Sequence, residues 1–76
     1  MTITDYNKLL HHFWQFTRER PTHCFINPAN LQGLMQSLQI GEVERIEGKL
    51  RILDVEITAV PNTPRDFICF GLHITT

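Results

Sequence analysis

The chain has 76 residues, with seven Lys and Arg against eight Asp and Glu, a formal net charge of −1 and 42% hydrophobic residues. A chain of this length buries roughly 63% of its unfolded surface, so we expect one small core and a single domain over residues 1–76. The composition argues against a disordered tail, and no apolar run reaches the roughly 20 residues of a membrane span. The balanced charge argues against nucleic-acid binding over a broad face.

The first expected element is a helix over about residues 5–19. Either Thr4 or Asp5 is expected to cap it, because a short side-chain oxygen accepts an orphan backbone N–H of the first turn. Pro21 ends the segment, since proline lacks the N–H and restrains the residue before it. The apolar residues with helical spacing, expected to form one buried stripe, are Tyr6, Leu9, Leu10, Phe13 and Phe16.

A short strand over residues 22–26 and a second helix are expected next. Asn27 is predicted to cap this helix and Pro28 to occupy its first position, where a missing N–H costs nothing. Gly41 suits the position just after the helix, and Gly33 is expected to mark a close approach to the sheet. The apolar face of the helix consists of Leu31, Leu34, Met35 and Leu38.

The middle of the chain is expected to be extended. Residues 42–48 are predicted as a loop or weak strand that ends in a turn at Glu47-Gly48. Its anchors are Val43 and Ile46. Residues 50–60 form the clearest predicted strand, with Leu53, Val55, Ile57 and Ala59 alternating with Asp54, Glu56 and Thr58. A change of phase near Ile52-Leu53 implies a bulge or a break into two strands.

Residues 61–64, Pro-Asn-Thr-Pro, separate this region from a last strand over residues 67–74. Both sides of that strand are largely apolar, which is typical of a central or doubly covered strand. One side holds Ile68, Phe70, Leu72 and Ile74, and the other holds Phe67, Cys69, Gly71 and His73. This order of elements predicts an α+β domain, with two helices packed on one face of a three- to four-stranded, mainly antiparallel sheet.

Three segments, residues 25–34, 50–57 and 60–61, resemble part of the major capsid proteins of tailed phages and of encapsulin-like shell proteins. In that family a strand leads into a helix reading N-P-x-x-L-x-x-L, as Asn27 to Leu34 does here, followed by strands and a proline-bearing loop. Asp54 stands where the family usually has Gly, and a capsid subunit is several times longer. The resemblance covers residues 23–71, implies a β-α-β-β unit of phage-like descent, and carries over no catalytic residue.

Neither a metal nor a cofactor is expected. The candidate ligands are His11, His12, His23, Cys24, Cys69 and His73, but no C-x-x-C or H-x₃-H spacing joins them. Cys24 and Cys69 are interpreted as reduced, buried thiols of a cytoplasmic protein, because the chain shows no signal peptide. His23 and Cys24 are neighbours on a strand and face apart, so no catalytic residue is predicted.

One face of the first helix is the candidate contact site. Lys8, His11, Gln15 and Arg18 are spaced by 3, 4 and 3 residues, and Trp14 lies at the border of this face. The face is either simply solvated or a contact surface for an acidic partner or phosphate, anchored by Trp14 and Arg18. Sheet edges offer a second surface, suited to a homodimer; the alternative is a monomer whose edges are blunted by Pro61, Pro64 and the Glu-rich residues 42–47.

These observations favour a small non-enzymatic protein-interaction module derived from a phage or other mobile element. Such a module would bind a protein partner of unknown identity, as a component of an assembly or as an inhibitor of a host factor. Two alternatives remain open: a small nucleic-acid-binding accessory protein, and a minimal thiol- or zinc-dependent enzyme.

Overall fold

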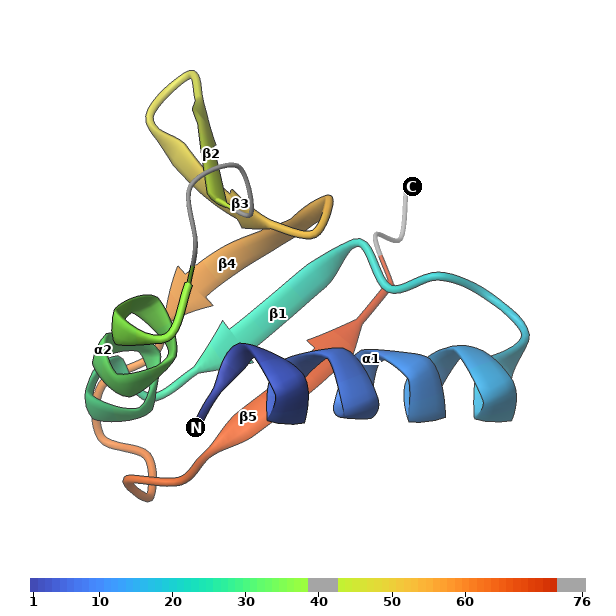
Figure 1. Cartoon of the computed structure of the whole chain (residues 1–76), viewed down its shortest axis with the longest axis horizontal. Helices are drawn as coiled ribbons and strands as arrows, with labels where there is room; N and C mark the ends of the chain where they lie inside the picture. The colour runs from blue at the N-terminus through green and yellow to red at the C-terminus, as the bar shows by residue number, and fades with distance from the viewer. Residues whose placement is uncertain (39–42, 73–76) are drawn as a thin grey trace.

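The computed structural model describes residues 1–38 and 43–72. In chain order its elements are α1 (Ile3–Thr17), β1 (His23–Ile26), α2 (Pro28–Gln36), β2 (Val43–Ile46), β3 (Lys49–Ile52), β4 (Val55–Ala59) and β5 (Ile68–Gly71). The strands form one sheet in the order β2-β3-β4-β1-β5, in which β1 and β4 are parallel and the other neighbours are antiparallel (Figure 1). The predicted α+β class is confirmed, but the sheet has five strands and is mixed.

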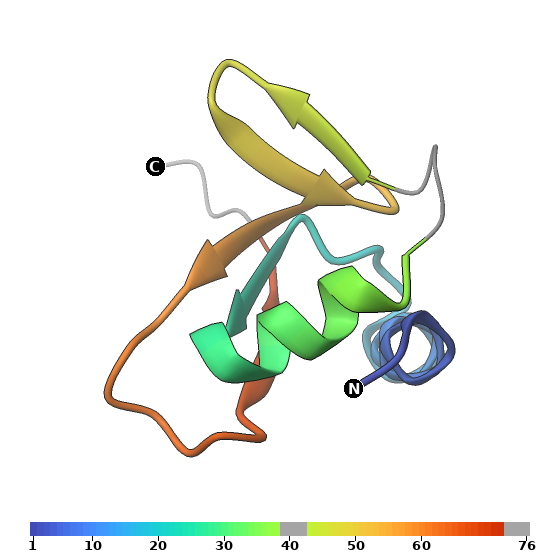
Figure 2. The same ribbon diagram turned by 60° about the vertical axis from the view of Figure 1, so that its left-hand side comes forward.

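Both helices lie on the same side of the sheet (Figure 2). The core between the helices and the sheet consists of Tyr6, Cys24, Ile26, Leu34, Ile52, Val55 and Ile57. Alternate strand residues enter this core, while those between them point to the opposite side, which carries no helix among the described residues. We call that opposite side the open face. The β2–β3 hairpin extends beyond the helices at one end of the sheet (Figure 1).

Helix α1 begins two residues earlier than predicted, because Thr2 and not Thr4 or Asp5 is its N-cap. The Thr2 hydroxyl accepts a hydrogen bond from the Asp5 N–H at 3.3 Å, and the Asp5 carboxylate accepts one from the Thr2 N–H at 3.2 Å. This reciprocal capping box satisfies two donors at once. The helix ends at Arg18, whose N–H donates to the Trp14 carbonyl oxygen at 2.7 Å.

The predicted buried stripe of α1 is only partly correct. Tyr6 is fully buried, and Leu10 packs against the core. The Phe13 ring centroid lies 6.3 Å from that of Phe70. Leu9 and Phe16, however, are 37% and 91% exposed. Their positions fall on one flank of the helix, because the line of contact with the sheet follows residues 6, 10, 13 and 17.

Helix α2 begins as predicted. The Asn27 side chain accepts a hydrogen bond from the Ala29 N–H at 2.8 Å, and Pro28 is the first helical residue. The helix ends at Gln36, and Gly41 lies outside the described residues. Gly33 does mark a close approach, but to Met1 and not to the sheet: an added Cβ would lie 3.6 Å from the Met1 backbone nitrogen.

Two tight turns join β2, β3 and β4. Glu47 and Gly48 have φ angles of 55° and 79°, and Leu53 and Asp54 have φ angles of 51° and 66°. Two successive residues with positive φ form the type I′ turn, whose twist matches that of paired strands. The turn predicted at Glu47-Gly48 is therefore confirmed. At Leu53-Asp54 the chain breaks into two strands, one of the two alternatives that the change of phase allowed.

Strand β5 lies at the edge of the sheet, so the prediction of a central or doubly covered strand was wrong. Ile68 and Phe70 pack against the core, whereas Cys69 is on the open face and is exposed. Cys24 is buried as predicted, the predicted burial of Cys69 was wrong, and both thiols are free. Apolar residues on both sides of β5 misled the prediction, because no helix of the described part of the chain covers the open face. His73 and Ile74 lie outside the described residues.

Candidate functional site

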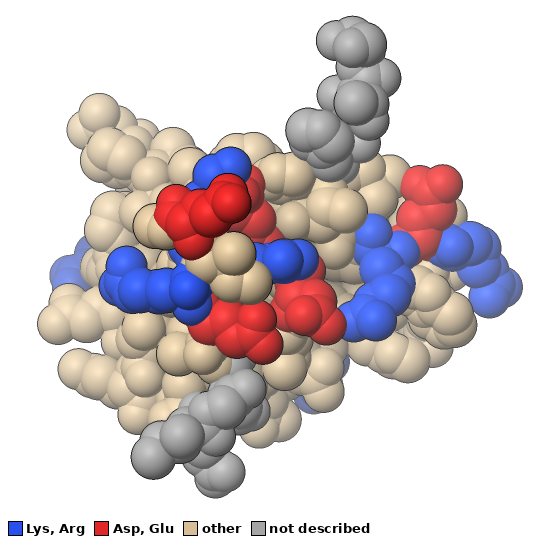
Figure 3. Space-filling model, turned by 90° about the horizontal axis from the view of Figure 1, so that it is seen from above, with Lys and Arg blue, Asp and Glu red and all other residues tan. Residues whose placement is uncertain are grey.

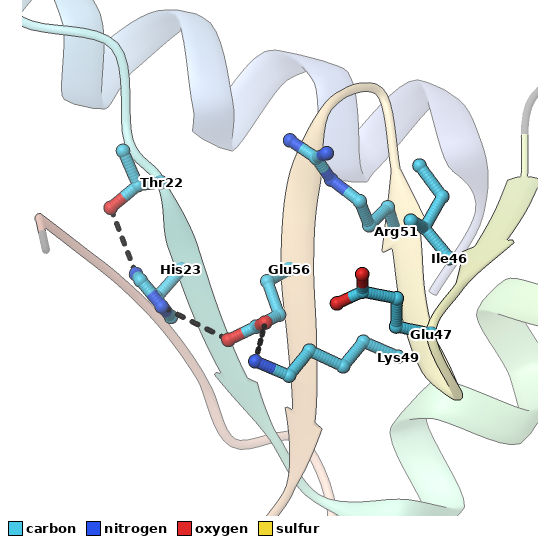
Figure 4. Close-up of a pocket in the computed structure, with 7 residues that line it drawn as sticks. All are labelled: Thr22, His23, Ile46, Glu47, Lys49, Arg51 and Glu56. Carbon is cyan, nitrogen blue, oxygen red and sulfur yellow. Dashed lines mark hydrogen bonds and ion pairs between the residues drawn. The ribbon is translucent and has the colours of Figure 1, made fainter.

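The open face carries a hollow of about 340 Å³ over β1, β3 and β4. Its lining residues are Thr22, His23, Ile46, Glu47, Lys49, Arg51 and Glu56. Figure 4 shows these side chains on the strands, with α1 behind the sheet. The alternation of the strands places them there: His23 and Glu56 sit next to the buried Cys24 and Val55 along their strands, so they point the other way.

Glu56 is the centre of a polar network in this hollow. One of its carboxylate oxygens lies 3.0 Å from His23 Nε2, and the other lies 3.3 Å from Lys49 Nζ. The hydrogen bond and charge of Lys49, together with those of His23, lower the pKa of the Glu56 carboxyl. The network spans three strands, because His23 is the register partner of Glu56 and Lys49 belongs to β3.

The order of groups around His23 is hydroxyl, imidazole, carboxylate, as in a catalytic triad. Thr22 Oγ1 lies 2.8 Å from His23 Nδ1, on the side opposite to Glu56. Yet Thr22 is exposed, and the carboxylate that would orient the imidazole is shared with Lys49. Triad chemistry depends on a site that excludes water. We therefore interpret the arrangement as a cross-strand network that fixes the orientation of His23.

Arg51 is the register partner of Glu56 in β3 but does not pair with it. Its guanidinium donates to the Asp54 carbonyl oxygen at 3.3 Å, and Figure 4 shows it turned away from the carboxylate. Glu47 supplies a second acidic group, so two carboxylates, the two cations Lys49 and Arg51, and His23 surround the hollow. Figure 3 likewise shows basic and acidic side chains interspersed on the visible face. A phosphate cradle would require an excess of positive charge.

The predicted contact site on α1 is exposed. Lys8, His11 and Gln15 lie along the outer side of the helix, and Arg18 follows as its C-cap. Trp14 is 41% exposed, and the His11 ring stacks against it with centroids 6.0 Å apart and an interplanar angle of 26°. We call these five residues the α1 surface.

The structure adds one residue that the helical spacing could not indicate. Arg20 lies beyond the end of α1, yet it lines a second hollow, of about 320 Å³, together with Leu10, His11 and Trp14. The segment after the C-cap turns back toward the helix, which places a cation beside the indole. The sequence shows only that Arg20 is a basic residue between the helix and Pro21. Where its side chain lies depends on the αL conformation of Arg18, which sets the direction of the chain after the helix.

Neither thiol is part of a metal-binding cluster in the described part of the chain. Among residues 1–38 and 43–72, no group of three His, Cys, Asp or Glu side chains could hold a metal ion. Cys24 and Cys69 face opposite sides of the sheet. Burial raises the pKa of the Cys24 thiol to about 12, which favours the neutral thiol over the nucleophilic thiolate. His73, another candidate ligand, lies outside the described residues.

No protein-family model, curated protein or solved structure matches this chain. No helix within the described residues is long and apolar enough to cross a membrane. A functional proposal therefore depends on the geometry of the open face and of the α1 surface.

Proposed function

We propose that the chain is a small, cytoplasmic, non-enzymatic module that binds a protein partner through the α1 surface. One observation carries this proposal: Trp14, the single tryptophan of the chain, is 41% exposed and stacks against the ring of His11. A large, rigid aromatic side chain supplies much contact area for little loss of entropy on binding. Tryptophan and arginine are also the residue types that most often dominate binding energy at interfaces.

The surroundings of Trp14 indicate the chemistry of the partner. The hollow beside the indole has an apolar wall from Leu10 and a cationic rim from Arg20. Lys8 and Arg18 add two further cations on the outer side of the helix. The residue between Arg18 and Arg20, Glu19, is acidic. An apolar side chain flanked by acidic residues would complement this surface.

The partner belongs either to an assembly that contains this module or to a host process that the module inhibits. Both roles need only non-covalent binding, so they are compatible with the raised pKa of the buried Cys24 thiol and with the exposure of Thr22. The resemblance to capsid and shell proteins remains a prediction. It adds the expectation that the partner is a viral structural protein or a host factor that a phage targets.

Site-specific photo-crosslinking tests this proposal. A benzophenone amino acid replaces Gln15 on the α1 surface or, as a control, Gln36 at the end of α2; both residues lie on the helical surface away from the core. We expect position 15 alone to give an adduct of defined mass in a lysate of the source cells. Unlabelled wild-type protein should suppress that adduct, and the Trp14→Ala variant should not. Equal adducts from both positions, or equal competition by Trp14→Ala, would contradict the proposal.

Two measurements separate this proposal from the alternatives. A nucleic-acid-binding protein would shift labelled DNA or RNA with a steep dependence on salt. A zinc-dependent enzyme would carry stoichiometric metal that a chelator removes. We expect neither result, because acidic and basic side chains are interspersed on the face seen in Figure 3 and the described thiols lie on opposite sides of the sheet.

A further inference from the structure

Among the described residues, strand β5 has a free edge. It is the last strand of the sheet on that side, and its sequence, Ile-Cys-Phe-Gly, contains no charged residue and no proline. The opposite edge strand, β2, carries Glu44 and Arg45, and charges of this kind oppose edge-to-edge pairing. Of the two edges, β5 is the one suited to accept another strand.

The hydrogen-bond pattern shows which backbone groups of β5 point outward. The Asn27 N–H donates to the Phe67 carbonyl oxygen at 3.1 Å, so these two residues form a hydrogen-bonded pair. Bonded and non-bonded pairs alternate along an antiparallel ladder, which makes Phe25 and Cys69 the next bonded pair. Ile68 and Phe70 are then in non-bonded pairs, and their N–H and C=O groups are directed to the free edge.

A second bond confirms this orientation from the other side of β1. The Ile26 carbonyl oxygen accepts a hydrogen bond from the Val60 N–H at 2.8 Å, so the Ile26 backbone is turned toward β4 and away from Ile68. On β5, the Cys69 thiol lies 3.5 Å from the Phe70 carbonyl oxygen. The thiol therefore leans toward the same free edge.

An apolar ridge on α1 continues this edge. Leu9 and Phe16, 37% and 91% exposed, lie on the same flank of the helix, on either side of Phe13, which contacts Phe70. The other flank faces the β3–β4 turn, because Asn7 lines a hollow together with Leu53. Leu9 and Phe16 accordingly face away from β3 and β4, beyond the β5 side of the sheet.

We propose that two copies of the chain associate through antiparallel pairing of their β5 strands about a two-fold axis at Cys69. Ile68 then pairs with Phe70 of the partner subunit, and the symmetry repeats this pair, so the outward groups of both residues form four hydrogen bonds. An axis at Ile68 would pair Phe70 with Asp66, and an axis at Phe70 would pair Ile68 with Leu72, both outside β5. The Leu9 and Phe16 ridges meet beside the joined edges.

The register has a chemical consequence at the axis. Cys69 faces Cys69 of the partner subunit as a non-bonded pair, with Cα atoms about 4.5 Å apart. That separation is within the range that a disulfide spans. The two thiols lie on the open face and are accessible to an oxidant, whereas Cys24 is buried.

Oxidation with diamide tests the register. Diamide takes up the two protons and two electrons that a pair of thiols releases when it forms a disulfide. The wild type and Cys24→Ser should form a covalent dimer, and Cys69→Ser should not. The matched control is the double variant Thr58→Cys and Cys69→Ser. It moves the thiol from β5 to an exposed position on β4, also on the open face. We expect this variant to cross-link at least about tenfold more slowly. Equal rates at positions 58 and 69 would overturn the proposal.

Sedimentation equilibrium tests the association without any cross-link. Cys69→Ser should be a dimer. Its Kd should rise about tenfold or more when Phe16→Asp is added, which places a charge in the ridge. Cys69→Lys, which places two cations at the axis, should weaken the dimer to a similar extent. Thr58→Lys should leave the Kd unchanged. A Cys69→Ser protein that is monomeric at every accessible concentration would refute the pairing. Trp14 of the α1 surface is on the flank of the helix opposite to Leu9 and Phe16, so Trp14→Ala should dimerise normally. This variant therefore separates the dimer inference from the proposed function.

Discussion

The Tyr6 hydroxyl donates a hydrogen bond to the Ile52 carbonyl oxygen at 2.9 Å, and both residues are fully buried. This bond joins the first helix to the last residue of β3, directly before the Leu53-Asp54 turn. The phenol thus brings a donor to this buried carbonyl from a distant part of the sequence. Burial raises the pKa of the Tyr6 hydroxyl well above its usual value, so it remains a donor at all physiological pH values.

We expect Tyr6→Phe to lower the free energy of unfolding by about 1–2 kcal/mol, because it removes the side-chain donor to a buried carbonyl oxygen. The ring itself keeps its edge-to-face contact with Phe70, at a centroid distance of 5.3 Å, so little apolar burial is lost. Urea unfolding followed by circular dichroism measures the change. Phe16→Leu is the control, since this exposed side chain contributes little to the fold of one copy. A Tyr6→Phe variant as stable as the wild type would contradict the role assigned to the bond.

Asp54→Gly should stabilise the fold by about 0.5–1 kcal/mol. Asp54 has a φ angle of 66°, a left-handed conformation that costs a side-chain-bearing residue roughly 1 kcal/mol and glycine nothing. The greater freedom of glycine in the unfolded chain offsets part of the gain. For a chain of this size we expect the Tm to rise by about 2–8 °C in calorimetry.

Two further variants in these turns test the same argument about backbone conformation. Gly48→Ala should destabilise by a similar amount, because Gly48 has a φ angle of 79° and an added Cβ would meet no atom within 4 Å, which leaves conformation as the only cost. Leu53→Gly should also destabilise despite its positive φ, because the Leu53 side chain packs against the core. A lower Tm for Asp54→Gly would show that the left-handed conformation of Asp54 does not limit the stability of this turn.

Local sequence signals predicted the parts of the fold that depend on neighbouring residues. Asn27-Pro28 predicts a helix start, because the Asn side chain can cap the first turn. Glu47-Gly48 predicts a turn, because its glycine readily adopts the positive φ that a type I′ turn needs. The second turn was ambiguous, because Leu53-Asp54 contains neither glycine nor asparagine. There only the change in alternation showed that the chain reverses, and it could not distinguish a turn from a bulge.

Pairing between distant segments could not be predicted. The parallel pairing of β1 with β4 places His23 beside Glu56, but either residue alone is an ordinary polar member of an alternating strand. The exposure of Phe16 and Cys69 follows from the lack of a helix beyond β5 and on the open face among the described residues, which no local pattern encodes. The α1 surface was predictable because helical spacing alone defines it, and Arg20 was not, because it joins the site after a turn.

The Glu56 network should make stability depend on acid. Lys49 and His23 lower the pKa of this carboxyl in the folded state, so the unfolded state binds its proton more readily as the pH falls. The stabilisation is complete above the ordinary carboxyl pKa of about 4.3 and is lost as the pH falls through the lower folded value. In Glu56→Gln, the urea midpoint should change less between pH 6 and pH 3 than it does in the wild type.

A second variant checks the cause of that dependence. Lys49→Gln removes the largest contribution to the lowered pKa of Glu56, so it should flatten the acid dependence in the same direction while the carboxyl is kept. Asp5, whose carboxyl pKa is lowered by its hydrogen bonds to Thr2, accounts for part of the dependence that remains. Parallel stability curves for the wild type and Glu56→Gln across this pH range would show that the network does not contribute.

The two cysteines should report separately on the surface and on the core. Cys69 is exposed, so iodoacetamide should modify it in the native protein without denaturant. Cys24 is fully buried, and burial raises its pKa to about 12, so its thiolate is scarce and inaccessible until the sheet opens. In the Cys69→Ser background, modification of Cys24 should therefore follow the fraction unfolded across a urea titration, as measured by mass spectrometry. Rapid native modification of Cys24 would mean that β1 is not covered by the helices, and it would favour the thiol-enzyme alternative over the interaction module.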